Sequence, residues 1–175
     1  MENKVILVDI FDNEIGECEK FKAHKSPVLH RAFSIFLFND NKLLLQKRAK
    51  NKYHSGGLWT NSCCSHPSPG SPLLENAQKR LEQELGIKDV PLTELFSFTY
   101  MAKFSENLFE YEFDHVLIGQ FCGKVKPNKE EASHVKWVDI DNLSQDLRLK
   151  PEKYTSWFHI CAPRVISYLK SQNAK

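Results

Sequence analysis

The stretch Trp59-Thr60-Asn61-Ser62-Cys63-Cys64-Ser65-His66-Pro67 separates two parts of the chain that differ in hydrophobic periodicity. Before it, the apolar runs at residues 32–38 and 43–48 flank Asn39-Asp40-Asn41, a pattern typical of a β-hairpin. After it, the apolar positions of residues 73–85 follow a helical spacing. Strand and helix patterns at separate places in the chain predict an α+β fold.

The rest of the chain adds strands on both sides of this junction. Gly86 stands where a helix over residues 73–85 would end in a left-handed residue. Residues 49–72 contain frequent Gly, Pro, Ser and Asn and should be mostly loop. A last helix is expected over residues 152–170, interrupted at Pro163. Further short β-rich runs predict strands near residues 5–10, 96–100, 110–121 and 135–138. We therefore expect a mixed β-sheet sandwich flanked by helices.

Composition narrows the classes of protein and partner. At 175 residues, 41% hydrophobic and 26% charged, the chain is expected to form a single domain over residues 1–175. A formal charge of +2 argues against nucleic acid or an anionic membrane surface as a partner. The most apolar run, residues 32–38, is too short for a membrane span, which needs about 20 residues. An odd number of cysteines and a start unlike a signal peptide favour a reduced chain in the cytoplasm, and a monomer is compatible with these data.

Glu84 is out of place in its helix. On a helical wheel it falls inside the apolar arc of residues 73–85. Two explanations remain open. Glu84 could form an i, i+4 pair with Arg80, or it could be a metal ligand, because a cation offsets the cost of burying a carboxylate.

A second group of residues has the donor types of a metal site. Glu110 and Glu112 are two apart in a strand and project from one face, while Phe109, Tyr111 and Phe113 take the other face, which we expect to be core. Neighbouring carboxylates repel unless a positive group lies between them. The chain also offers imidazoles at His24, His30 and His66. Taken singly, each of these residues is more often a surface or core residue than a ligand. Together they suit a borderline divalent ion, whereas no Cys-x-x-Cys spacing supports a structural zinc module.

Two further features point to acid–base chemistry and anion binding. Cys64 lies in a polar loop with His66 two residues on, a setting in which a thiol can exchange a proton. The basic residues Lys20, Arg48, Lys52 and Arg80 are scattered on segments that flank these loops. If the fold brought them together, they would form a small anion pocket without changing the net charge.

The residues 59–67, together with Leu29-His30-Arg31-Ala32-Phe33-Ser34, Glu84-Leu85-Gly86 and Glu110-Tyr111-Glu112, resemble the type I isopentenyl-diphosphate isomerases. This resemblance covers residues 20–157 and implies a Nudix-like fold with its core at about residues 28–145. It implies an isomerase that interconverts isopentenyl diphosphate and dimethylallyl diphosphate through a tertiary carbocation, in isoprenoid biosynthesis.

The same resemblance assigns roles to single residues. It implies Cys64 and Glu112 as the catalytic pair, although it does not decide which gives the first proton. It implies a Mg²⁺ shared by the substrate diphosphate, Glu84 and the Cys64 carbonyl. A second divalent ion, Mn²⁺ or Zn²⁺, would be held by His24, His30, His66, Glu110 and Glu112. The substrate would contact Lys20, Arg48, Lys52 and Arg80 through its diphosphate and Tyr100 and Trp157 through its hydrocarbon part.

Two other functions compete with this one. A Nudix hydrolase needs four acids in its signature, and three of those positions are Ser71, Arg80 and Gln83 here, leaving only Glu84. A hydrolase that holds metals and activates water with these carboxylates would lack them. The alternative from a different class is a non-enzymatic metal-binding module, which would unfold when the metal is chelated.

Overall fold

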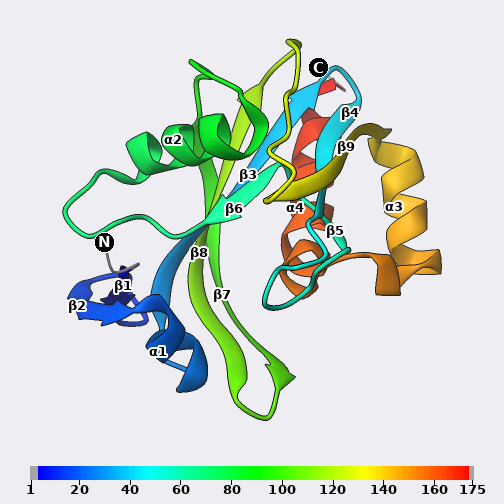
Figure 1. The fold of residues 1–175 in the computed structure, drawn as a ribbon. Coiled ribbons are helices and arrows are strands. Elements are labelled where there is room, and N and C mark those ends of the chain that lie inside the picture. The colour runs from blue at the N-terminus through cyan, green and yellow to red at the C-terminus, as the bar shows by residue number, and fades with distance from the viewer. Residues whose placement is uncertain (1–3, 174–175) are drawn as a thin grey trace.

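A computed structural model describes residues 4–173 of the chain. Within this range the strands join into one sheet, covered by helices on both faces (Figure 1). In chain order the elements are β1 (Lys4–Val8), β2 (Glu14–Glu19), α1 (Lys20–Lys25), β3 (His30–Asn39), β4 (Lys42–Arg48), β5 (Trp59–Thr60), β6 (Cys63–Ser65), α2 (Leu73–Leu85), β7 (Thr93–Ser105), β8 (Leu108–Gln120), β9 (Ala132–Asp139), α3 (Ile140–Leu149), a short 3-10 helix η1 (Pro151–Lys153) and α4 (Ser156–Asn173). The predicted α+β class is confirmed.

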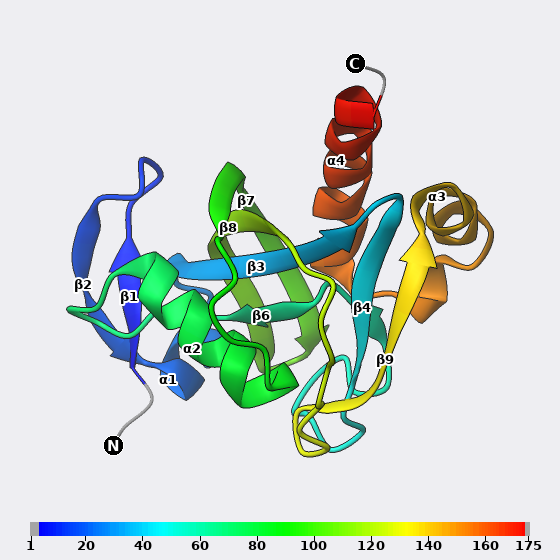
Figure 2. The same cartoon turned by 90° about the horizontal axis from the view of Figure 1, so that it is seen from above.

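Strand β3 connects the two halves of the sheet. It pairs antiparallel with β1, β4 and β6, and parallel with β8. The outer strands extend the sheet from there, since β7 pairs with β8 and β9 pairs with β4. The long, strongly curled strands β7 and β8 cross behind β3 (Figure 2).

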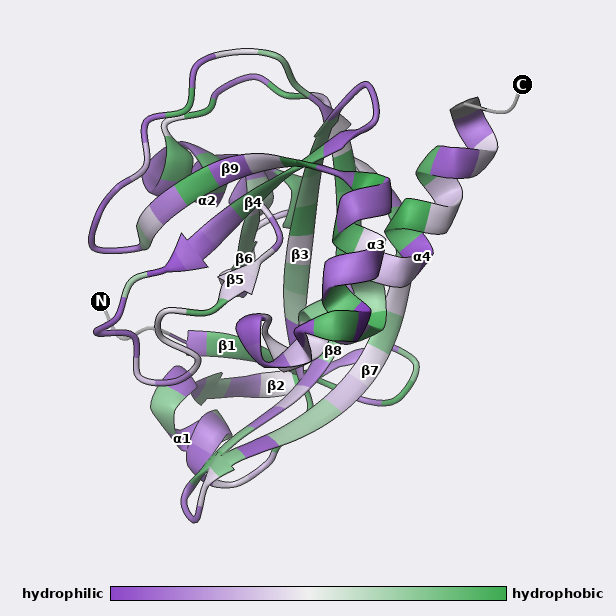
Figure 3. Ribbon diagram, turned by 90° about the vertical axis from the view of Figure 1, so that its right-hand side faces the viewer, coloured by the Kyte–Doolittle hydropathy of each residue, from purple (hydrophilic) through white to green (hydrophobic). Residues whose placement is uncertain are grey.

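The apolar run at residues 32–38 is continuous because β3 is covered on both faces. Phe36 points into the core beneath α4, whereas Phe33, Ile35 and Leu37 point into the core beneath α2. Strand β4 is apolar at Leu43, Leu44 and Leu45 and hydrophilic toward its end (Figure 3), where Gln46 and Arg48 line a cavity. The core therefore ends where the chemistry-bearing side chains begin.

The last helix differs from the expectation. Helix α4 runs from Ser156 to Asn173 without a break at Pro163. Pro163 is exposed, and its neighbours Phe158, Cys161 and Val165 are fully buried against the sheet. Their burial outweighs the loss of one backbone hydrogen bond. Helices α1 and α3 and strand β2 were not predicted. Helix α1 and strand β2 have only six residues each, whereas the spacing of Ile140, Leu143 and Leu147 in α3 is helical and could have identified it. None of the described helices is long and apolar enough to cross a membrane.

Helix α2 ends as predicted, and its end allows a stability test. Gly86 has φ +66°, and a Cβ built there would lie 3.1 Å from the Lys126 Cβ. Gly70 has a similar φ of +74°, but a Cβ there would meet nothing within 4 Å. A left-handed conformation costs a non-glycine residue roughly 1–2 kcal/mol. We expect Gly86→Ala to lower the free energy of unfolding by that amount or more, measured by urea denaturation, and Gly70→Ala to lower it less. Equal losses would contradict the role of the Lys126 contact.

Candidate active site

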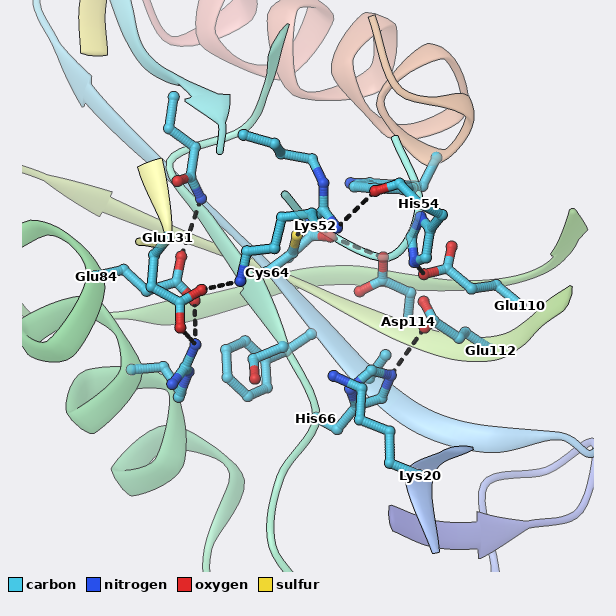
Figure 4. Close-up of a pocket in the computed structure, with 18 of the residues that line it drawn as sticks. Lys20, Lys52, His54, Cys64, His66, Glu84, Glu110, Glu112, Asp114 and Glu131 are labelled. Atoms are coloured by element: carbon cyan, nitrogen blue, oxygen red, sulfur yellow. Dashed lines mark hydrogen bonds and ion pairs between the residues drawn. The ribbon is translucent and has the colours of Figure 1, made fainter. Parts of the chain in front are cut away.

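Three neighbouring strands bring the predicted catalytic residues together. Strand β3 lies between β6 and β8, with Ser34 opposite Cys64 and His30 opposite Glu112. Cys64 and Glu112 both line one cavity (Figure 4). Residues separated by almost fifty positions in the sequence thus meet on one face of the sheet.

Strand β8 turns its acidic face inward, opposite to the expectation for its aromatic face. Glu110 and Glu112 are each 5% exposed, whereas Phe109, Tyr111 and Phe113 are only partly buried. Tyr111 and Phe113 instead pack on the small apolar cluster of Ile6, Val8 and Leu29. The expected core role of the aromatic face therefore holds only in part, because Tyr111 and Phe113 contact a small separate core cluster and stay partly exposed. The acids can be buried because histidine and tyrosine side chains supply partners for them.

Four of the five predicted ligands of the transition-metal site converge. The ligand atoms of His24, His30, His66 and Glu112 all lie within 4.8 Å of one another. The second ring nitrogens are directed by the backbone, since His24 Nδ1 lies 2.6 Å from the Lys20 carbonyl oxygen and His30 Nδ1 lies 2.8 Å from that of Val28. Such contacts leave Nε2 of each ring free to coordinate a metal.

The charge states of these side chains also fit a divalent cation. Burial lowers the pKa of His24 to about 4 and that of His66 to about 3. Burial alone would raise the pKa of Glu112, but hydrogen bonds with His30 and His66 hold it well below its ordinary value. His24, His66 and Glu112 are therefore in the forms that bind metals, whereas Glu112 raises the pKa of His30 against the effect of burial, so a metal would have to displace a proton there. His30 Nε2 and His66 Nε2 lie only 3.2 Å apart, and His66 Nδ1 is buried without a partner among residues 4–173. A shared cation would relieve the crowding of these nitrogens.

Glu110, the fifth predicted ligand, has other partners. Its Oε1 lies 2.8 Å from His54 Nε2, and its Oε2 accepts a hydrogen bond of 2.8 Å from the Tyr100 hydroxyl. The same hydroxyl lies 2.7 Å from Glu112 Oε2. Glu110 thus lies beside the group of four rather than within it. Tyr100 links the two carboxylates.

Cys64 lies in a setting that keeps its thiol protonated. Burial raises the pKa of this thiol, although the nearby Arg48 opposes the shift. Arg48 Nη1 approaches the sulfur to 3.9 Å, and the Arg48 guanidinium carbon lies 5.3 Å from the centre of the Trp157 ring. The indole nitrogen of Trp157 donates to Asn61 Oδ1 at 3.1 Å, which fixes the ring over the cavity. A neutral thiol can donate a proton.

Glu84 forms the i, i+4 ion pair with Arg80 that was one of its two expected roles. Arg80 Nη2 donates to Glu84 Oε1 at 2.5 Å, and Gln46 Nε2 donates to Glu84 Oε2 at 3.0 Å. Glu84 also lines the cavity, so the ion pair does not remove it from the site. Arg80 occupies one of the acidic positions of the hydrolase signature, so the cavity has a cation where a hydrolase would have a carboxylate.

The four cations predicted to bind an anion line one cavity, and two of them pair with acids there. Lys52 forms an ion pair with Glu131, and Arg80 Nη2 lies 3.4 Å from Glu131 Oε1. All four predicted cations and both predicted aromatic residues line the cavity, namely Lys20, Arg48, Lys52, Arg80, Tyr100 and Trp157. Among the predicted site residues, only His24 and His30 lie outside its lining; His24 lines the adjoining cleft.

Among the cavity residues that were missed in the sequence, three carry a carboxylate or an imidazole. Asp114 extends the alternation of Glu110 and Glu112, and this signal could have identified it. It is 2% exposed, and its Oδ2 accepts a hydrogen bond of 2.7 Å from Ser34 Oγ. Burial raises the pKa of Asp114 well above its ordinary value. Glu131 and His54 carried no comparable signal, because both lie in segments without regular periodicity.

The curled mixed sheet with α2 on one face defines a known class of fold. Residues 28–158 match the family model described as NUDIX domain. A crystal structure of a Deinococcus radiodurans protein superposes with a TM-score of 0.76, at 18% identity, covering 92% of this chain and 98% of that one, which supports the fold alone. The chain is therefore a Nudix-domain protein, as the resemblance implied.

Closer relatives define the family within this class. The chain is 49% identical over 168 residues to Isopentenyl-diphosphate Delta-isomerase 2 of Aromatoleum aromaticum, covering 95% of this chain and 88% of that protein. It is 48% identical over 159 residues to Isopentenyl-diphosphate Delta-isomerase of Serratia proteamaculans, covering 90% and 88%. The chain belongs to the isopentenyl-diphosphate Delta-isomerase family.

Proposed function

We propose that the cavity between β6 and β8 is the place where this member of the family interconverts isopentenyl diphosphate and dimethylallyl diphosphate, with Cys64 and Glu112 as its two proton-transfer groups. The observation that carries the proposal is the position of these two side chains in one cavity that all four predicted cations also line. The reaction belongs to isoprenoid biosynthesis.

The reaction needs two groups because it moves a double bond. One carbon of the substrate gains a proton and another carbon loses one, so one group must donate a proton while the other accepts one. Cys64 comes from β6 and Glu112 from β8, with β3 between them. A buried neutral thiol can donate a proton, and an ionised carboxylate can accept one.

The four cations would hold the diphosphate. Arg48, Lys52 and Arg80 reach the cavity from β4, the following loop and α2, and Lys20 reaches it from α1. Charge-assisted hydrogen bonds to phosphate oxygens fix the position of a ligand as well as its affinity. A fixed head group sets the distance of the alkene from both proton-transfer groups.

The aromatic residues would protect the intermediate. Protonation of the alkene produces a tertiary carbocation, which water would capture. Trp157 is 2% exposed and Tyr100 is 7% exposed, so both present dry ring surface. A desolvated aromatic face stabilises a cation by roughly 2 kcal/mol or more.

We also propose the identities of two metal ions. The residues His24, His30, His66 and Glu112, with Glu110 beside them, would hold Mn²⁺ or Zn²⁺, because mixed imidazole and carboxylate donors suit a borderline ion. Glu84 and the Cys64 carbonyl would hold Mg²⁺ together with the substrate diphosphate. When bound, such ions neutralise phosphate charge and change the proton affinity of nearby carboxylates.

The remaining proposals concern the whole chain. Residues 1–175 would act as a single domain, of which residues 1–3 and 174–175 lie outside the described part. The five cysteines are all free, which supports the cytoplasm as the location.

The direct test is to incubate the protein with isopentenyl diphosphate and Mg²⁺ and to follow the formation of dimethylallyl diphosphate. We expect the two isomers to reach equilibrium without loss of diphosphate. Release of phosphate from nucleoside diphosphate derivatives would favour a Nudix hydrolase instead. No allylic product, combined with unfolding after chelation, would favour a metal-binding module.

A further inference from the structure

His54 is a buried residue of the cavity that the two-base scheme does not use. It lies in the loop between β4 and β5 and is 7% exposed. The neighbours of His54 must supply polar and packing contacts, because burial of an imidazole without partners is unfavourable. The contacts of the ring show what holds it.

Aromatic rings enclose His54 on several sides. Its ring stacks on Phe104 with centroids 4.3 Å apart and an interplanar angle of 20°. It meets Trp157 edge-on at 6.0 Å and Tyr53 edge-on at 4.4 Å. Its Nε2 lies 2.8 Å from Glu110 Oε1, and its backbone carbonyl accepts a hydrogen bond from Arg48 Nη2 at 3.2 Å. These contacts fix both the loop and the ring.

The location of His54 defines one end of the cavity. Glu84 and Glu131 lie at the opposite end, and Cys64 lies between the two ends (Figure 4). Lys52 and Arg80 pair with the acids of that opposite end, where the diphosphate would be held. The hydrocarbon part of the substrate must therefore extend from Cys64 toward His54 and Trp157.

We propose that His54, backed by Phe104, is the end wall of the hydrocarbon pocket and restricts the substrate to a five-carbon diphosphate. This inference rests on the proposed function of the cavity. A rigid ring at the end of the pocket excludes substrates with an additional methylene group. Discrimination of one methylene in a well-packed pocket amounts to about 10-fold to 200-fold in kcat/KM.

The test compares two substrates in the same variants. The first is isopentenyl diphosphate, and the second is the homologue in which an ethyl group replaces the methyl branch. In the unaltered protein we expect a high ratio of kcat/KM for the first over the second. His54→Ala removes the ring, and Phe104→Ala removes the support behind it. Each should lower the ratio by about tenfold or more. His134→Ala changes an exposed histidine of β9 and should leave the ratio unchanged.

The outcomes separate the possible failures. If His54 served only to hold Glu110, both substrates would lose kcat/KM equally and the ratio would stay constant, which would overturn the inference. If His54→Ala does not fold, Phe104→Ala decides by the same ratio. If the unaltered protein converts neither substrate, the proposed function fails first. If it converts isopentenyl diphosphate but both variants keep the original ratio, only the end-wall inference fails.

Discussion

Cys64→Ala and Glu112→Gln are each expected to lower the kcat of isomerisation by about 100-fold to 10,000-fold, because each removes one of the two groups that transfer a proton. Both substitutions keep the approximate size of the side chain, so the fold should persist. The measurement is the rate of dimethylallyl diphosphate formation, with circular dichroism to confirm folding.

The chain offers a matched control for the thiol. Cys122 is exposed and lies outside the cavity lining, so Cys122→Ala should keep the full rate. Glu112→Gln also removes a carboxylate from the histidine group, so its metal content has to be measured alongside its rate. Full turnover in a folded Cys64→Ala variant would rule out the two-base scheme.

Removal of the metal is expected to abolish activity without unfolding the chain. The histidine group shares no residue with the two main hydrophobic cores, so chelation should leave the thermal unfolding transition in place. Because the donors are imidazoles and a carboxylate, Mg²⁺ alone should restore the rate only in part, and Mn²⁺ or Zn²⁺ together with Mg²⁺ should restore it fully. The measurements are rate, metal content and unfolding temperature of the chelated protein.

A single substitution tests the same site. His66→Ala should lower the affinity for the transition metal by about 100-fold or more, since loss of even an outer partner of a ligand costs about 10-fold to 100-fold. His134→Ala is the control, because His134 is an exposed histidine outside the group of four. Cooperative unfolding of the chain upon chelation would contradict the expectation that the fold persists without the metal.

Sequence patterns were sufficient where local periodicity decides the structure. The helix over residues 73–85 and its end at Gly86 were predicted correctly, since the apolar spacing and the left-handed glycine act over a few residues. The hairpin of β3 and β4 was predicted for the same reason. The uninterrupted α4 could not be predicted, because the penalty at Pro163 is local but the burial that offsets it comes from the sheet.

The site, too, could be predicted from the sequence only in part. The types of donor could be read from the sequence, and so could the odd position of Glu84 and the alternation of Glu110 and Glu112. The sequence did not show which face of the strand carries the acids into the interior. A strand has two faces, and distant segments decide what covers each of them. Ile6 and Val8 of β1 and Leu29 contact Tyr111 and Phe113 on the aromatic face, and the acids on the other face line the cavity.

The sequence by itself determined the fold class, the family resemblance and the list of residues able to transfer protons or bind metals, since these depend on composition and on spacing along the chain. Only the tertiary structure decided which of them meet. Strand pairing places Cys64, His30 and Glu112 on adjacent strands, and it sets His54 against Phe104 at one end of the cavity. The physical reason is that register and sheet curvature are set by burial over the whole molecule, which no local pattern contains.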